Sequence, residues 1–160
     1  MLAGSETIAT SVDHWLGQFE RALTEPDDVL LKTLFHADSH WRDLLALTWH
    51  IRTANGREAV LGQLKAHAGR AHATGFRTDP HRTAPRHVMR AGSHAIEAIF
   101  QFETDEGRGN GVLRLRPDEK NTLRAWTLLT ALDEIKGFAE QVGRSRPSGK
   151  SYSRDFRGPN

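Results

Sequence analysis

Apolar residues change their spacing near the middle of the chain, and this change separates a helical first part from a sheet-forming second part. Spacings of three and four predict an amphipathic helix over residues 6–24. A pair of aspartates after a proline predicts a second, short helix that starts at residues 27–28. Helical spacing returns over residues 57–71 and predicts a third helix.

One extended segment, residues 40–55, lies between the second and third predicted helices. It ends in an Asn-Gly turn, so it predicts a single strand that leads through a turn into a helix. Trp41, Asp43 and Trp49 stand at odd positions and would share one face of that strand. Tryptophans beside an aspartate indicate a pocket. The alternative is that the tryptophans form an ordinary core and that Asp43 belongs to a surface ion pair with a neighbouring arginine.

The second part has the alternation of a sheet. It is clearest over residues 94–103, and further strands are expected over 85–90, 111–116 and 123–132. The glycine-rich stretch 105–111 predicts a hairpin tip, because a dinucleotide-binding loop would be followed by a helix and not by a strand. The fold class is therefore α+β, with three N-terminal helices packed on a curved antiparallel sheet.

The length of 160 residues fits one domain. Residues 1–137 form this domain, and the Gly, Ser, Arg and Pro content of residues 138–160 predicts a polar tail or linker, or else a C-terminus that drapes over the domain. The absence of cysteine excludes disulfides and thiol chemistry. The start is unlike a signal peptide and no apolar run approaches about 20 residues, so we expect a soluble, cytoplasmic protein without membrane contact.

Charge gives little support for a polyanionic partner, because 22 basic residues are balanced by 20 acidic ones. No nucleic acid is expected, since the basic sector of the chain has only Phe76 as an interleaved aromatic residue for base stacking. This sector contains Arg70, Arg77, Arg82, Arg86 and Arg90. A metal site is not expected either. His36 and His40 are four residues apart, but the sequence places no third ligand beside them.

Several segments resemble a known family. The order of elements, with LFHADSHWRD, HIRTANGREAV and AWTLLTALDEIKG, is similar to the nuclear transport factor 2 (SnoaL-like, ketosteroid isomerase-like) superfamily, in which helices close a cone-like sheet around a pocket. More narrowly, HWRDLLALTWHIRT, AIEAIFQFET and GRSRPSGKSYSRDFRGPN resemble the N-terminal domain that precedes the flavin-binding module in a group of flavin-containing monooxygenases.

The resemblance implies a pocket for a small, largely apolar molecule. Asp43 would be its general base, since a carboxylate between aromatic walls loses hydration in its ionised form. His50 and His87 could hold or relay a proton, which completes the expected catalytic set. The expected ligand-binding residues are Trp41, Trp49, Arg52, Phe100 and Trp126.

Two functions from different classes follow. The first is an accessory domain that binds a ligand or mediates assembly, with no cofactor in this chain and with flavin chemistry in a downstream module. The second is a free-standing isomerase, hydratase or cyclase that uses Asp43 as base. Related isomerases polarise substrates with tyrosines, whereas the only tyrosine here, Tyr152, lies in the tail; this favours the accessory domain. A sheet face left uncovered in so small a domain further predicts a homodimer.

Overall fold

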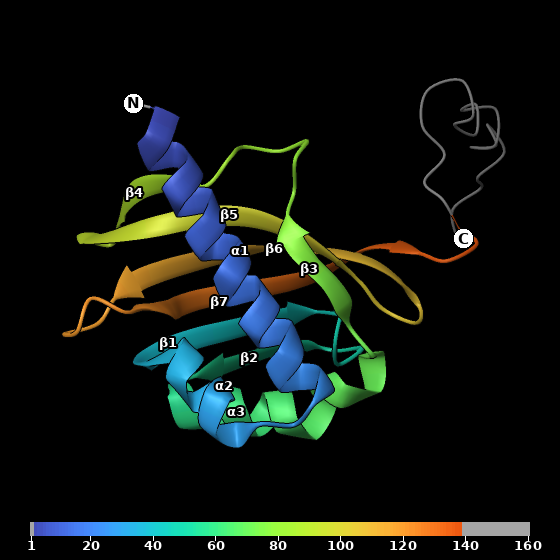
Figure 1. Ribbon diagram of the computed structural model, residues 1–160. Helices are drawn as coiled ribbons and strands as arrows, with labels where there is room; N and C mark the ends of the chain where they lie inside the picture. Colours follow the sequence, from blue (N-terminus) through green and yellow to red (C-terminus); the bar gives the residue numbers. More distant parts are fainter. Residues whose placement is uncertain (1, 139–160) are drawn as a thin grey trace, which may run out of the picture.

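The computed structural model describes residues 2–138, with side chains from residue 7 onward. Three helices and a short 3-10 helix accompany seven strands, and most of the expected elements are present (Figure 1). In chain order they are α1 (Leu2–Thr24), α2 (Asp28–Leu34), β1 (Phe35–Leu44), β2 (Ile51–Asn55), α3 (Arg57–His67), η1 (Ala68–Ala71), β3 (Thr74–Thr78), β4 (Arg86–Arg90), β5 (Ser93–Glu103), β6 (Gly107–Pro117) and β7 (Leu123–Ile135).

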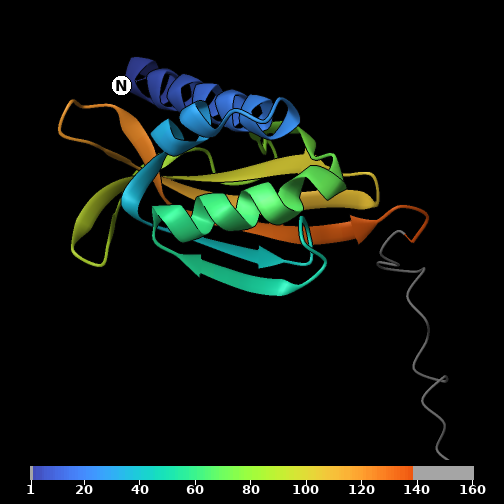
Figure 2. The same cartoon turned by 90° about the horizontal axis from the view of Figure 1, so that it is seen from below.

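The strands form one curved sheet with the order β2-β1-β7-β6-β5-β3, and β4 also pairs with β5. The predicted meander β5-β6-β7 is antiparallel, but β1 pairs with β7 in parallel, so the sheet is mixed and not purely antiparallel. The helices lie on one face of the sheet (Figure 2). We call this the inner face, and the opposite one the outer face. The predicted α+β class, with three helices on a curved sheet, is confirmed.

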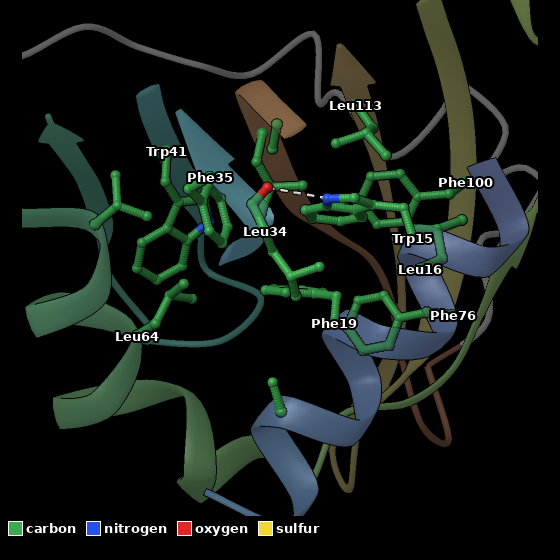
Figure 3. Packing of buried hydrophobic residues seen from close by; sticks show 14 of the residues in the cluster. Trp15, Leu16, Phe19, Leu34, Phe35, Trp41, Leu64, Phe76, Phe100 and Leu113 are labelled. Carbon is green, nitrogen blue, oxygen red and sulfur yellow. Dashed lines mark hydrogen bonds between the residues drawn. The ribbon is translucent and has the colours of Figure 1, made fainter. Parts of the chain in front are cut away.

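The space between the helices and the inner face is filled by aromatic side chains (Figure 3). Trp15 and Phe19 of α1 stack with ring centroids 5.2 Å apart, and Phe76 stacks on Phe102 at 4.8 Å. Phe100 is fully buried beside Phe76. Each such pair adds about 0.5–1.5 kcal/mol beyond the burial of apolar area. Aromatic packing therefore joins α1 to the inner face of the sheet.

Glycines of the 105–111 stretch lie within β6, so the prediction of a hairpin tip there was wrong beyond residue 106. Gly109 and Gly111 pair with Phe102 and Phe100 across the strands. A Cβ atom at either glycine would collide with the ring of its partner. Glycine is used here because it leaves room for two large rings on the inner face, and not because it turns the chain.

The predicted single strand over residues 40–55 is also wrong, because β1 and β2 form an antiparallel hairpin around a loop at residues 45–50. Leu45 and Trp49 adopt left-handed backbone angles, with φ of 65° and 58°. Non-glycine residues avoid this region at a cost of about 1–2 kcal/mol each. Alternation along the sequence did not reveal this loop, since its conformation depends on hydrogen bonds to a side chain of β1.

Candidate binding site on the outer face of the sheet

Asp43 is fully buried, and its carboxylate accepts hydrogen bonds from the loop that follows it. The amide of Leu47 lies 3.1 Å from both carboxylate oxygens, and the amide and hydroxyl of Thr48 lie 2.9 and 2.7 Å from Oδ2. The hydroxyl of Thr130 donates to Oδ1 at 2.6 Å. Several donors on one carboxylate satisfy a charge that would otherwise be costly to bury.

The network continues in both directions from Asp43. The indole Nε1 of Trp41 donates to the Thr130 hydroxyl at 3.0 Å, and the amide of His50 donates to the Thr48 hydroxyl at 3.2 Å. Strand register brings the Thr130 hydroxyl to the Asp43 carboxylate, because Asp43 pairs with Thr130 across β1 and β7. The arrangement fixes the β1–β2 loop to the sheet, so the geometry supports a structural role for Asp43.

The two predicted histidines contribute no side-chain hydrogen bond to the Asp43 carboxylate among the described residues. His50 is exposed in the β1–β2 loop. His87 is exposed on β4, and strands β7, β6 and β5 lie between β1 and β4 in the sheet. These positions leave the catalytic roles of Asp43, His50 and His87 as predictions.

The predicted ligand-binding residues occupy separate parts of the molecule. Trp41 and Phe100 are buried in the core, whereas Trp49 is 47% exposed at the tip of the β1–β2 hairpin. Arg52 donates to the side chain of Gln63 on α3. Trp126 lies under the guanidinium of Arg116, 4.6 Å from the ring centroid. The expected convergence of these side chains on one pocket is not observed.

A hollow of about 360 Å³ lies on the outer face, over β1, β2, β6 and β7. Val112 and Leu129 supply apolar surface, and Arg42 and Arg114 supply positive charge. The other residues that line the hollow are His40, Trp41, Thr53, Thr127 and Leu128. An apolar hollow with a few charged groups at its edge is a common form of small-molecule site.

Strand register builds this hollow from two adjacent rows of residues. One row is apolar and runs from Ile99 through Val112 and Leu129, ending at Arg42. The next row is polar and contains His40, Thr127, Arg114, Glu97 and Arg86. The sequence contains a signal for the hollow, since apolar and charged residues alternate along the predicted strands. The signal is incomplete, because only the pairing of the strands brings the two rows together.

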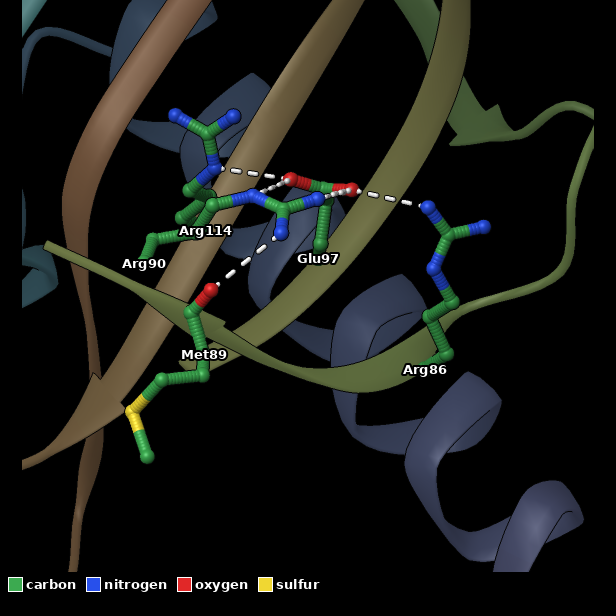
Figure 4. A network of polar contacts seen from close by, with 5 residues as sticks. All are labelled: Arg86, Met89, Arg90, Glu97 and Arg114. Atoms are coloured by element: carbon green, nitrogen blue, oxygen red, sulfur yellow. Dashed lines mark hydrogen bonds and ion pairs between the residues drawn. The ribbon is translucent and has the colours of Figure 1, made fainter. Parts of the chain in front are cut away.

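Beside the hollow, Glu97 binds three arginines (Figure 4). Arg114 Nε donates to Oε2 at 2.8 Å, Arg90 donates to both carboxylate oxygens at 3.1 and 3.0 Å, and Arg86 lies 3.2 Å from Oε1. Burial alone would raise the pKa of Glu97, but the hydrogen bonds from Arg114 and Arg90 lower the pKa below 4.5. Three guanidinium groups around one carboxylate leave a local excess of positive charge next to the hollow.

Within residues 2–138, no three His, Asp or Glu side chains are grouped so that they could hold a metal ion. None of the helices in that range is long and apolar enough to cross a membrane.

Comparison with known proteins identifies the fold of this chain. No protein-family model matches the sequence, and no curated protein matches it. Among solved structures, an NTF2-like superfamily protein from Salmonella enterica is 12% identical with a TM-score of 0.57, covering 86% of this chain and 99% of its own. ActVI-ORFA from Streptomyces coelicolor is 13% identical with a TM-score of 0.52, covering 78% and 96%.

Nuclear transport factor 2 from Cryptosporidium parvum is 10% identical with a TM-score of 0.50, and the alignment covers 80% of this chain and 94% of that one. The chain therefore has the nuclear transport factor 2-like fold. Proteins of one fold carry many functions, so the function has to be argued from the site.

Proposed function

We propose that this domain is a binding module whose outer-face hollow takes a small, largely apolar molecule with an acidic group. The observation that carries the proposal is the hollow itself, in which the apolar row ends at Arg42 and lies beside Arg114. Apolar surface supplies most of the affinity for such a ligand, and the guanidinium groups orient its acid.

Catalysis by Asp43 is a less favourable hypothesis. A general base must reach the proton that it removes. Here the carboxylate is buried and accepts hydrogen bonds from Leu47, Thr48 and Thr130. A substrate would first have to displace these donors, so the accessory function is the better supported of the two.

The resemblance to the N-terminal domain of flavin-containing monooxygenases extends the proposal. The domain would then hold or deliver an apolar acid beside a flavin-binding module, while the flavin chemistry takes place in that module. The predicted tail, 138–160, lies outside the described residues apart from Phe138. This part of the proposal therefore rests on the sequence segments that resemble those monooxygenases.

A dye-binding experiment tests the hollow. The probe is anilinonaphthalene sulfonate, an apolar anion whose fluorescence rises on binding. Leu129→Glu places a negative charge in the hollow and should abolish binding, whereas Leu129→Lys, a matched control of similar polarity, should retain it. Arg42→Gln should weaken binding of the dye by about tenfold to a hundredfold, because a charged hydrogen bond is worth about 1.5–3 kcal/mol.

A neutral apolar dye such as Nile red provides the second control. Its binding should not change in Arg42→Gln, since no acid is present to meet the guanidinium. Unchanged binding of the anionic dye to Leu129→Glu would show that the hollow is not the site, provided that the thermal melting of the variant shows it to be folded.

A further inference from the structure

The β1–β2 loop holds a tryptophan outside the core by several independent restraints. Trp49 has left-handed backbone angles, with φ of 58°, and its side chain is 47% exposed. The amide of Leu45 donates to the carbonyl of His50 at 3.1 Å, closing the loop, and the Asp43 carboxylate accepts from Leu47 and Thr48 within it. Strained, over-determined segments of this kind cluster at functional sites.

Apolar exposure is concentrated around this tryptophan. Leu45 and Ile51 flank the loop and are 42% and 67% exposed. Because β1 and β7 run in parallel, the loop lies at the same end of the sheet as the end of β7, where Ile135 and Phe138 are also exposed. Five of the seven large exposed apolar side chains of residues 7–138 thus gather at one end. Exposed apolar clusters of this kind mark interaction surfaces.

Positive charge lies next to the loop. Partial burial lowers the pKa of His67 below 6.5, and the nearby charges of Arg52, Arg70 and His50 act in the same direction. Over residues 7–138, none of these four side chains forms an ion pair with an acid; Arg52 donates only to the neutral amide of Gln63. The guanidinium groups of Arg52 and Arg70 are therefore available to a partner.

We propose that Trp49, Leu45 and Ile51, with Arg52 and Arg70 beside them, form a docking surface for an acidic polypeptide segment that carries apolar side chains. Trp49 is the anchor, and Asp43 is a positioning residue that acts through the loop. None of these residues lines the outer-face hollow, so the proposal does not depend on the function proposed above.

Charge decides between the candidate occupants. The polar tail does not fit, because residues 138–160 contain five basic residues and two acidic ones, and their net positive charge would be repelled. An anionic membrane fits less well than a polypeptide, since each arginine near a lipid surface contributes only about 1 kcal/mol. Two arginines are too few for stable attachment, whereas they suffice to orient an acidic segment on an aromatic anchor.

The test uses the full chain and a series of short peptides that share the same leucine and phenylalanine content but range from acidic to basic. Titration calorimetry should show binding of the acidic peptides, and Trp49→Ala should weaken it at least about tenfold, as expected for an aromatic anchor. Arg52→Gln should weaken binding several-fold and reduce its dependence on salt. Met89→Ala removes a similarly exposed side chain on β4 and should leave binding unchanged.

A separate measurement tests the role of Asp43 in positioning Trp49. In Asp43→Asn the indole resonance of Trp49 should shift and peptide affinity should fall, while binding of anilinonaphthalene sulfonate to the hollow should persist. Equal affinity for acidic and basic peptides would overturn the proposal, as would undiminished binding to Trp49→Ala. Trp49-dependent binding to phosphatidylserine vesicles without binding of acidic peptides would assign the surface to a membrane instead. A halved mass of Trp49→Ala in light scattering would assign it to self-association and equally overturn the proposal.

Discussion

The sequence predicts that Asp43 is a catalytic base, whereas in the structure its buried carboxylate holds the β1–β2 loop in place by hydrogen bonds. Its neighbours in sequence suggested a pocket or an arginine partner. Instead, the acceptor capacity of the carboxylate is used by backbone and hydroxyl donors of Leu47, Thr48 and Thr130. Such local side-chain-to-backbone bonds define turns, and they leave no periodic signal in the sequence.

The first prediction at this scale concerns the stability of Asp43→Asn. The amide supplies one acceptor oxygen in place of two and turns an NH₂ group toward existing donors. We expect a loss of about 2–4 kcal/mol in the free energy of unfolding, because buried donors are left without acceptors. Urea denaturation measures this loss. Asp38→Asn, on an exposed position of the same strand, is the control and should change stability little.

Stability close to that of the wild type in Asp43→Asn would contradict the structural role and restore Asp43 as the candidate base.

Single residues also show how much of the structure could be predicted from the sequence. The shared face of Trp41 and Asp43 was predicted correctly from alternation. The position of Trp49 was not, because the loop at residues 45–50 breaks the alternation after Leu44.

At the scale of elements, β5 is the strand that alternation described best. Its inner positions bury Phe100 and Phe102, and its outer positions place Glu97 against arginines of β4 and β6. The start of β6 was missed because glycines were taken as signs of a turn. Only the pairing of Gly109 and Gly111 with the two rings shows why glycine is needed within a strand.

The Glu97 cluster joins three strands, and we expect it to make stability depend on pH. The pKa of Glu97 is lowered in the folded state, so its stabilisation is fully present above the unfolded value of about 4.5. It is lost as the pH falls through the folded pKa. Denaturation at pH values on both sides of 4.5 should show this loss in the wild type and a smaller one in Glu97→Gln.

Glu103→Gln changes an exposed carboxylate on the same strand and serves as the control for this experiment. It should keep the pH dependence of the wild type. Equal slopes for Glu97→Gln and the wild type would mean that the three guanidinium groups do not couple Glu97 to folding. The substitution should also lower stability at neutral pH, since it leaves three arginines without their shared acid.

At the scale of the whole molecule, the order of elements and the short sequence segments that resemble the superfamily correctly predicted the nuclear transport factor 2-like fold. What they implied about a pocket inside the cone stays a prediction, because fold alone does not determine how the interior is filled. Here Trp15, Phe19, Phe76, Phe100 and Phe102 occupy it. The outer face, which none of the helices within residues 2–138 covers, is left as the surface on which binding and assembly can be tested.

The expected homodimer is the prediction that belongs to this scale. Ile99, Val112 and Leu129 form an apolar row on the outer face, and burial of this row by a second copy would remove it from water. In such a dimer the hollow lined by Val112 and Leu129 would lie between the two copies, so its small molecule would be bound at the interface. A two-fold axis would bring the same patch of both copies together. Light scattering at tens of micromolar should therefore give twice the monomer mass of 17.9 kDa.

Val112→Glu distinguishes this interface from any other. Val112 is half-buried in the single chain, so a glutamate there can reach water in the monomer, whereas in the dimer each copy would bury an unpaired charge. The variant should have the monomer mass and a folded melting transition, while Val112→Thr, nearly equal in size and uncharged, should remain dimeric. A wild-type mass of 17.9 kDa would contradict the prediction, and a dimeric Val112→Glu would move the interface to another surface of the domain.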